Sequence, residues 1–145
     1  MSSHMRAIQV LLVEDDAADV RLTEEALKAS RFSLKLEAVD DGEKAIRYLR
    51  REGEYRAKQR PDLIVLDLNL PRKDGREVLL EIKHDEDLKK IPVVVLTTSN
   101  AASDVAKVYA AGGNCFVTKP LDFADFQKAI LGIEDFWFSI ARLPE

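Results

Sequence analysis

The chain has 145 residues and a formal net charge of −4, and 46% of its residues are hydrophobic and 33% charged. This composition is typical of one soluble globular domain, and because the chain has a single cysteine, it forms no internal disulfide and no cysteine-based zinc site. The acidic balance argues against nucleic acid as a partner, and no apolar run approaches the ~20 residues that span a membrane.

The two ends of the chain indicate where the folded domain lies. Residues 1–5 (MSSHM) resemble a cloning remnant ahead of a native start. We therefore expect one domain over residues 6–141, with no separate output domain after it. Because no charged and then apolar leader opens the chain, the sequence predicts a cytoplasmic location.

Short apolar runs predict five β-strands. In chain order, they cover residues 8–13, 32–39, 63–66, 92–96 and 115–117. Four of them are nearly continuous in apolar residues, as expected for parallel strands that helices cover on both faces. Residues 32–39 instead alternate between apolar and polar side chains, which predicts a strand at the edge of the sheet.

Apolar residues at helical spacing follow every predicted strand. The patterns cover residues 20–27, 45–49, 78–82, 105–109 and 126–140. Regular alternation of strands and helices predicts an α/β fold, a doubly wound five-stranded parallel sheet of order 2-1-3-4-5 with right-handed crossovers. Such a flavodoxin-like sheet binds its ligand at the carboxyl ends of its strands.

Polar side chains stand where four of these strands end. They are Glu14, Asp15 and Asp16 after the first strand, Asp67 at the end of the third, Thr97 after the fourth and Lys119 after the fifth. Carboxylates that converge from neighbouring strand ends repel one another, so the cluster predicts a bound cation, and Mg²⁺ suits oxygen ligands. With the metal bound, one carboxylate serves as the nucleophile toward a phosphoryl group, giving an aspartyl phosphate. The ammonium of Lys119 and the hydroxyl of Thr97 would then meet the phosphoryl oxygens.

Each of these residues also has an ordinary structural interpretation. Asp16 suits the N-cap of the first helix, and for that reason we leave it out of the metal site. Lys119, taken alone, would be a solvated loop residue, and only the acidic cluster favours a functional role for it. Thr97 could be a hydrogen-bonded strand end, and Phe116, in the fifth strand, a plain core residue.

With these features in place, the chain resembles the receiver domains of two-component response regulators over about residues 9–138. Four segments carry the resemblance in order: 12–16 (LVEDD), 66–71 (LDLNLP) followed by Asp74 and Gly75, 96–98 (LTT) and 116–120 (FVTKP). Each segment is weak evidence alone, but the four at this spacing are specific. The domain at residues 6–141 is thus identified as a receiver domain.

The resemblance implies a role for each residue of the site. Asp67 would be the phosphoacceptor, Glu14 and Asp15 the acidic pocket, and Asn69 the residue whose main-chain carbonyl completes the protein ligands of Mg²⁺. Thr97 and Phe116 match the switch pair, and Lys119 matches the lysine that contacts the phosphate. The family also implies a cis bond between Lys119 and Pro120.

The resemblance further implies a function. The chain would accept a phosphoryl group from a histidine kinase on Asp67 and change its protein-binding surface, with only self-phosphotransfer and slow autodephosphorylation as activities, and so it would not be an enzyme acting on an external substrate. Residues 14–21 and 68–75, the polar link 52–60 and the closing residues 136–138 (FWF) resemble single-domain regulators paired with phytochrome-type histidine kinases.

Two other classes of protein use similar residues. A phosphohydrolase of the haloacid-dehalogenase type also has a strand-end Asp nucleophile with Mg²⁺, Thr or Ser, and Lys. Its general acid is a second Asp two residues later, where this chain has Asn69, and 145 residues leave no room for a substrate cap. The other class is a receiver-like interaction module that is never phosphorylated, although this chain has all the side chains that phosphorylation requires.

The last helix predicts a homodimer. One stripe, made of Phe126, Ile130, Ile133, Trp137 and Ile140, is long enough to face the sheet. Leu131, Phe136 and Phe138 fall elsewhere, and exposed apolar side chains of this kind mark interfaces, most often between two copies of one chain. The alternative is that these rings fold back on the flank of the domain, or that the helix frays before Pro144.

Overall fold

The computed structural model describes residues 7–141, 143 and 144, so the suggested cloning remnant lies outside the described residues. Strands and helices alternate along this part of the chain as β1 (Ile8–Val13), α1 (Ala17–Leu27), β2 (Leu34–Val39), α2 (Gly42–Leu49), β3 (Leu63–Leu66), α3 (Gly75–His84), β4 (Val93–Thr97), α4 (Ala102–Ala110), β5 (Cys115–Thr118) and α5 (Phe123–Asp135). Short helical turns are η2 (Gly53–Tyr55), η3 (Leu88–Lys90) and the π-type turn η4 (Phe136–Ile140). None of the described helices is both long and apolar enough to cross a membrane.

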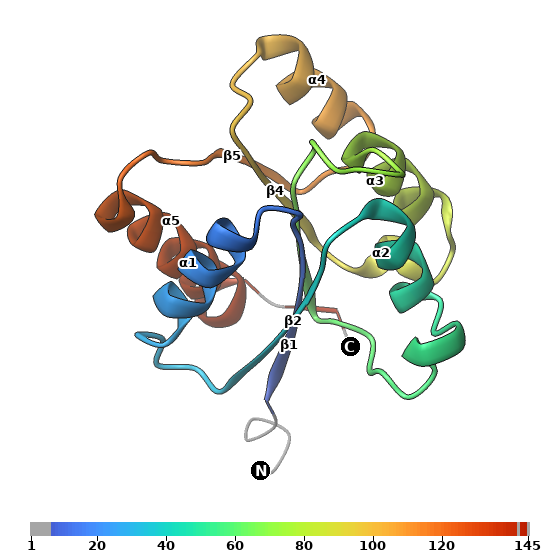
Figure 1. Cartoon of the computed structure of the whole chain (residues 1–145), viewed down its shortest axis with the longest axis horizontal. Helices are drawn as coiled ribbons and strands as arrows, with labels where there is room; N and C mark the ends of the chain where they lie inside the picture. The colour runs from blue at the N-terminus through green and yellow to red at the C-terminus, as the bar shows by residue number, and fades with distance from the viewer. Residues whose placement is uncertain (1–6, 142, 145) are drawn as a thin grey trace.

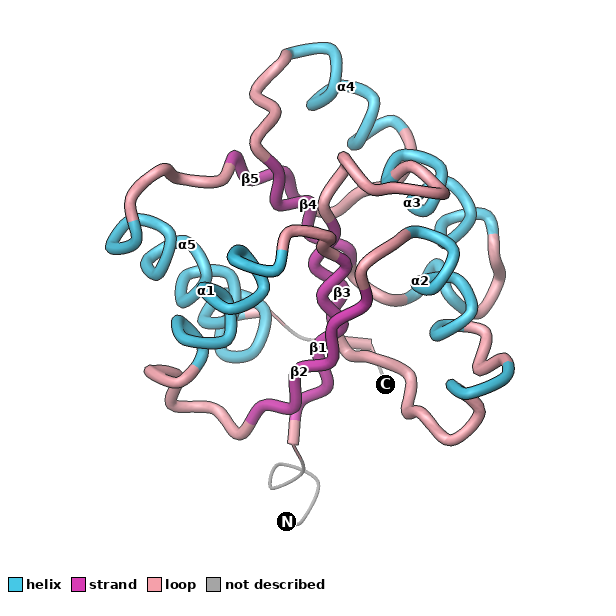
Figure 2. The backbone as a smooth tube through the Cα atoms, in the orientation of Figure 1, coloured by secondary structure: helices cyan, strands magenta, loops and turns pink. Residues whose placement is uncertain are grey.

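The five strands form one parallel sheet in the order β2-β1-β3-β4-β5, which confirms the predicted fold class and strand order. Seen edge-on, the sheet has α1 and α5 on one face and α2, α3 and α4 on the other (Figures 1 and 2). Each helix that joins two successive strands therefore packs on one face of the sheet. The limits of the domain at residues 6 and 141 stay a prediction.

Two apolar cores lie on the two faces of the sheet because successive side chains of a strand point to opposite sides. Leu11 and Val13 of β1 belong to the core with α2 and α3, whereas Val10 and Leu12 belong to the core with Phe126 of α5. All residues of β3 and β4 are buried, and their apolar side chains also alternate between the two cores. The unbroken apolar runs that predicted these strands therefore serve two cores at once.

Both edges of the sheet differ from the prediction in detail. β2 is an edge strand, as predicted, but it begins at Leu34, and Phe32 instead packs edge-on against Phe138, with 5.8 Å between ring centroids. β5 forms the other edge, so Cys115 is only half-buried rather than enclosed between two layers of helices. Burial still raises the pKa of the Cys115 thiol, which disfavours the reactive thiolate.

The predicted apolar stripe of the last helix is correct over most of its length and wrong at its end. Phe126 and Ile130 are buried, and Ile133 and Trp137 pack against the same core, but Ile140 is 70% exposed. The reason is that α5 gives way to the wider π-type turn η4 at Phe136, so the spacing of an α-helix no longer returns Ile140 to the sheet.

Candidate functional site at the carboxyl ends of the strands

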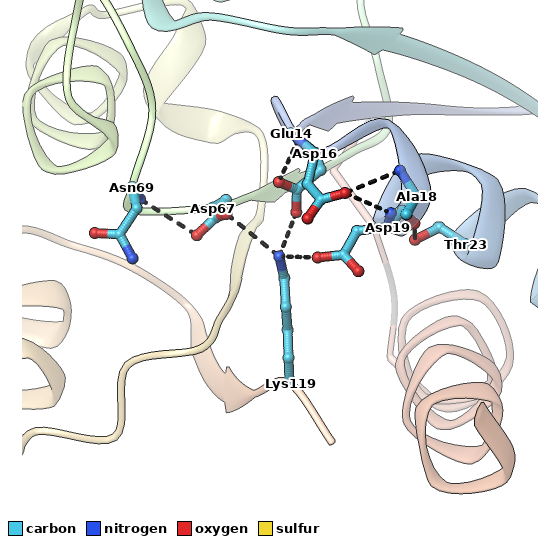
Figure 3. A network of polar contacts seen from close by, with 8 residues as sticks. All are labelled: Glu14, Asp16, Ala18, Asp19, Thr23, Asp67, Asn69 and Lys119. Atoms are coloured by element: carbon cyan, nitrogen blue, oxygen red, sulfur yellow. Dashed lines mark hydrogen bonds and ion pairs between the residues drawn. The ribbon is translucent and has the colours of Figure 1, made fainter. Parts of the chain in front are cut away.

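The parallel register brings the predicted site residues together. β1 and β3 pair so that Val13 lies beside Leu66, and the Asp67 N–H donates to the Val13 carbonyl over 3.0 Å. Glu14 and Asp67 therefore leave adjacent strands side by side, and both are buried. Lys119, which follows β5, reaches across the end of the sheet to both of them (Figure 3).

The Lys119 ammonium is the centre of this network. Its Nζ donates to Glu14 Oε1 over 2.5 Å, to Asp19 Oδ2 over 2.7 Å and to Asp67 Oδ2 over 3.3 Å. The side chains of Lys119, Glu14 and Asp67 are 6%, 4% and 8% exposed, whereas that of Asp19 is 24% exposed. One buried cation thus faces three carboxylates, and the exposed Asp15 adds a fourth nearby.

Crowding of these charges shifts their pKa values. Burial raises the pKa of Glu14 to about 7, the negative charge of Asp67 adds to the rise, and the hydrogen bond from Lys119 opposes it. Burial alone would lower the pKa of Lys119, but the hydrogen bonds to Asp19 and Glu14 outweigh it and raise the pKa above its usual value. The lysine therefore stays charged, and Glu14 takes up a proton readily.

Three carboxylates are placed to share a cation. Oxygens of Glu14, Asp15 and Asp67 all lie within 4.8 Å of one another. Hard oxygen ligands of this kind suit Mg²⁺, Mn²⁺ or Ca²⁺, and a divalent charge would offset the excess of carboxylates over the one ammonium. Asn69 lies beside this group, since its N–H donates to Asp67 Oδ1 over 3.3 Å (Figure 3). The role of its carbonyl as a metal ligand stays a prediction.

Thr97 and Phe116 lie at the end of β4 and in β5, the next strand along the sheet. Thr97 is fully buried, and its hydroxyl oxygen has no hydrogen-bond partner among the described residues. A buried polar group without a partner costs free energy, so the site favours an arriving oxygen there. The Phe116 ring is half-buried against the core on the α3 side, and the main-chain N–H of Phe116 donates to the Tyr109 hydroxyl over 3.1 Å.

The fourth helix, next to these two residues, is held mainly by polar contacts. Val108 is its one buried residue, and Tyr109, expected on the packed face, is 51% exposed. The Ser99 hydroxyl, in the loop before α4, donates to Asp104 over 2.6 Å, and Asp104 in turn accepts from Arg76 of α3 over 3.0 Å. A helix with so little apolar burial costs little to shift.

Two further expectations have clear outcomes. Asp16 caps α1, since its carboxylate accepts from the N–H groups of Ala18 and Asp19, which confirms its structural role. The expected cis bond between Lys119 and Pro120 is wrong, because no cis peptide bond occurs among the described residues. The trans form is the intrinsically favoured isomer even before proline.

Asp19 is the site residue that the sequence analysis missed. It lies in the first turn of α1, and only three residues separate α1 from the end of β1. A helix that begins so close to the carboxyl end of β1 could have indicated that its first turn lies beside the acidic pair. Its partner, Lys119, is a hundred positions away along the chain, so no local pattern predicted their contact.

Comparison with known proteins agrees with this site. A family model described as "Response regulator receiver domain" matches residues 10–131. Response regulator Rcp1 of Synechocystis sp. (strain ATCC 27184 / PCC 6803 / Kazusa) is 51% identical over 135 residues, which cover 93% of this chain and 92% of Rcp1. The structure of the phosphorylated cyanobacterial phytochrome response regulator RcpA has a TM-score of 0.93 at 50% identity and covers 97% of this chain and 100% of RcpA. The Mn²⁺-bound form of Rcp1 has a TM-score of 0.91 at 50% identity and covers 95% of this chain and 99% of Rcp1.

Proposed function

The chain belongs to the response regulator receiver domain family, and from that premise we propose that it accepts a phosphoryl group on Asp67 and changes its protein-binding surface as a result. One observation carries the assignment to Asp67: its buried carboxylate has an oxygen within 4.8 Å of oxygens of Glu14 and Asp15, and it also accepts a hydrogen bond from the ammonium of Lys119. Incubation with Mg²⁺ and acetyl phosphate should add one acid-labile phosphoryl group, which intact-mass spectrometry detects.

The side chains of the site divide the work of phosphotransfer. A carboxylate oxygen of Asp67 attacks the phosphorus of a phosphohistidine or acetyl phosphate, the bond to the donor breaks, and its electron pair leaves with the donor. Mg²⁺, when bound, neutralises the carboxylates and the phosphoryl oxygens. Lys119 then donates to a phosphoryl oxygen, and the unpartnered hydroxyl of Thr97 donates to another.

A receiver domain binds a divalent metal ion at its acidic pocket, and we propose Mg²⁺ as the ion and Glu14, Asp15, Asp67 and the Asn69 carbonyl as its protein ligands. The bound Mn²⁺ is a property of Rcp1. Carboxylate and carbonyl oxygens with room for retained waters are what Mg²⁺ prefers in proteins.

Magnesium binding should depend on pH through Glu14. Because the pKa of Glu14 is raised to about 7, the metal-free site holds a proton below that pH, and the metal ion must displace it. Calorimetry should show affinity falling by up to about tenfold per unit as pH drops from 7 to 5, and levelling off above 7. Glu14→Gln should bind Mg²⁺ more weakly and with much less pH dependence. An unchanged slope in that variant would contradict the assignment of the titration to Glu14.

The same raised pKa affects the metal-free fold. A carboxyl group whose pKa is higher in the folded than in the unfolded chain stabilises the fold below the unfolded value, and that stability is lost as pH rises through about 7. Without Mg²⁺, Glu14→Gln should therefore unfold at a higher denaturant concentration than the parent at pH 8.

We further propose that Thr97 and Phe116 form the switch. Thr97→Val replaces the hydroxyl with a methyl group at the same branch of the side chain, so the fold should be as stable as the parent or more so, because that hydroxyl is buried and unpartnered. The response of the Phe116 and Tyr109 amide signals to acetyl phosphate, measured by NMR, should be largely lost. The matched control is Thr98→Val, in the exposed neighbouring position. A full response in Thr97→Val would assign the switch to another residue.

The partner of the site is a histidine kinase, and we propose one of the phytochrome type. The support is the similarity over nearly the whole chain to Rcp1 and to the cyanobacterial phytochrome response regulator RcpA. Phosphotransfer measured against purified histidine kinases would test this choice. Nothing in the site favours a phosphohydrolase, and we expect no turnover of an external phosphate ester. The cytoplasmic location stays a prediction.

We also propose a homodimer through α5 and η4, on a smaller surface than the sequence predicts. Phe138 packs on Phe32 of its own domain, so for this ring the alternative, that it folds back on the flank of the domain, is correct. Phe136 and Ile140 are 48% and 70% exposed and lie one turn apart, and Phe123, at the start of α5, is 45% exposed. Apolar side chains left in solvent favour a second copy as cover.

Light scattering tests the dimer. The parent should be dimeric at micromolar concentration, and the double variant Phe136→Ala, Ile140→Ala should be monomeric and folded. Phe138→Ala is the control, since it should lower stability by about 3 kcal/mol through the lost ring packing while leaving the association in place. A monomeric parent, or a double variant that associates as tightly as the parent, would remove this surface from consideration.

A further inference from the structure

We propose that Asp19 is a positioning residue for Lys119: its carboxylate holds the ammonium toward α1 while Glu14 and Asp67 turn to the metal ion. The inference rests on the function proposed above and adds a residue to it. It is based on the contacts of one atom. Lys119 Nζ lies 2.7 Å from Asp19 Oδ2 and is also bonded to Glu14 and Asp67, two of the proposed metal ligands (Figure 3).

The ammonium and a divalent cation compete for the same carboxylates. Lys119 contacts Glu14 Oε1 and Asp67 Oδ2, and both side chains belong to the group whose oxygens converge within 4.8 Å. Two cations this close together repel each other strongly, since the site is buried and poorly screened. Entry of the metal ion should therefore loosen the bonds of Lys119 to Glu14 and Asp67.

Asp19 differs from the other partners of Lys119. Its oxygens are not part of the converging group found among the described residues, so a metal ion held by Glu14, Asp15 and Asp67 leaves the bond between Asp19 and Lys119 free to persist. With a side chain only 6% exposed, Lys119 is too buried to rely on water as its sole partner. Asp19 thus keeps the ammonium charged, paired and within reach of Asp67.

The position of Asp19 is itself fixed. It lies in the first turn of α1, where the helix dipole stabilises a negative charge, and its N–H donates to the capping carboxylate of Asp16 over 3.3 Å. Its side chain is 24% exposed, so the charge is only partly desolvated. A carboxylate anchored in this way cannot follow Lys119 into the site, and it defines one of the two positions between which the ammonium moves.

A double-mutant cycle with Lys119 tests this role. Asp19→Asn keeps the size of the side chain and removes its charge, and calorimetry should show Mg²⁺ affinity falling about 10-fold to 100-fold, the usual range for groups that support a metal site from outside its ligands. In a Lys119→Met background there is no ammonium to hold, so adding Asp19→Asn should change the affinity by no more than about threefold. Asp19→Glu should restore much of the affinity of the parent.

The loss of one negative charge near the site would by itself lower Mg²⁺ affinity in Asp19→Asn, and a matched control separates this effect from the positioning of Lys119. Glu24, exposed on α1 beside the groove that Glu14 and Asp15 line, carries the same charge without touching Lys119, and Glu24→Gln should leave Mg²⁺ affinity within about twofold. An equal loss of affinity from Asp19→Asn with and without Lys119 would overturn the proposal, as would no loss in either background. Circular dichroism of each variant confirms that α1 is folded.

The outcome for Asp19 is separable from that for Asp67. If the parent binds Mg²⁺ but takes no phosphoryl group, the cycle still measures the positioning of Lys119, and only the proposed function fails. If the parent is phosphorylated on Asp67 and Asp19→Asn binds Mg²⁺ like the parent, only the role of Asp19 fails. Absence of Mg²⁺ binding by the parent would overturn both.

Discussion

Asp67→Asn should abolish phosphorylation of the chain. The amide is a far weaker nucleophile than the carboxylate, and the change also removes one of the three carboxylates that converge on the metal position. The mass of the variant should not change after incubation with Mg²⁺ and acetyl phosphate, whereas the parent gains one phosphoryl group.

The control for this experiment is Asp87→Asn. Asp87 is exposed and its side chain caps no helix, so this variant should be labelled as fully as the parent. If Asp67→Asn is labelled to the same extent as the parent, the assignment of the phosphoacceptor is wrong. Peptide mapping would then show whether Asp15 or Asp16 takes the phosphoryl group instead.

Gly75→Ala should destabilise the fold by about 3 kcal/mol, the upper part of the usual cost of overpacking. A Cβ atom at this position would lie 2.2 Å from the Asp67 carbonyl oxygen and 2.6 Å from Leu68 Cα. Both obstacles are backbone atoms, so no side-chain rotation relieves the clash. The Gly75 N–H also donates to the Leu68 carbonyl over 2.9 Å, which ties the start of α3 to the segment that carries the phosphoacceptor.

The effect of Gly75→Ala should extend to function. Relief of the clash must move the peptide after Asp67, so phosphorylation by acetyl phosphate should slow as well. The matched control is Gly132→Ala in α5, where a Cβ atom would meet nothing within 4 Å. That variant should be more stable by up to about 1 kcal/mol, since alanine is the better helix former. Urea unfolding of both variants measures the difference, and equal midpoints for Gly75→Ala and the parent would contradict the close approach.

The structure also changes how some of the predicted residues are understood. Thr97 could have been an ordinary hydrogen-bonded strand end, but its buried hydroxyl has no partner among the described residues. Phe138 could have been part of an interface, but it packs on Phe32, on the flank of its own domain. In both cases the sequence left two interpretations open, because each depends on contacts with residues from another part of the chain.

Local patterns in the sequence were sufficient for the order of strands and helices, for the sheet order and for the meeting of Glu14, Asp67 and Lys119 at one edge of the sheet. Continuous apolar runs mark β1, β3 and β4, since a strand covered by helices on both faces needs apolar side chains on both. The position of the site then follows from topology alone, because parallel strands bring their carboxyl ends to one edge of the sheet. Glu14, Asp67 and Lys119 meet there although they are far apart in the chain.

Tertiary structure decided the features that depend on distance across elements. The contact between Asp19 and Lys119, the close approach of Gly75 to Asp67, the half-burial of β5 and the π-type turn that exposes Ile140 all arise from how the helices sit on the sheet. A sequence pattern reports which side of an element a residue faces, but not what stands opposite it. That depends on packing, in which a shift of one or two ångströms separates a hydrogen bond from a clash.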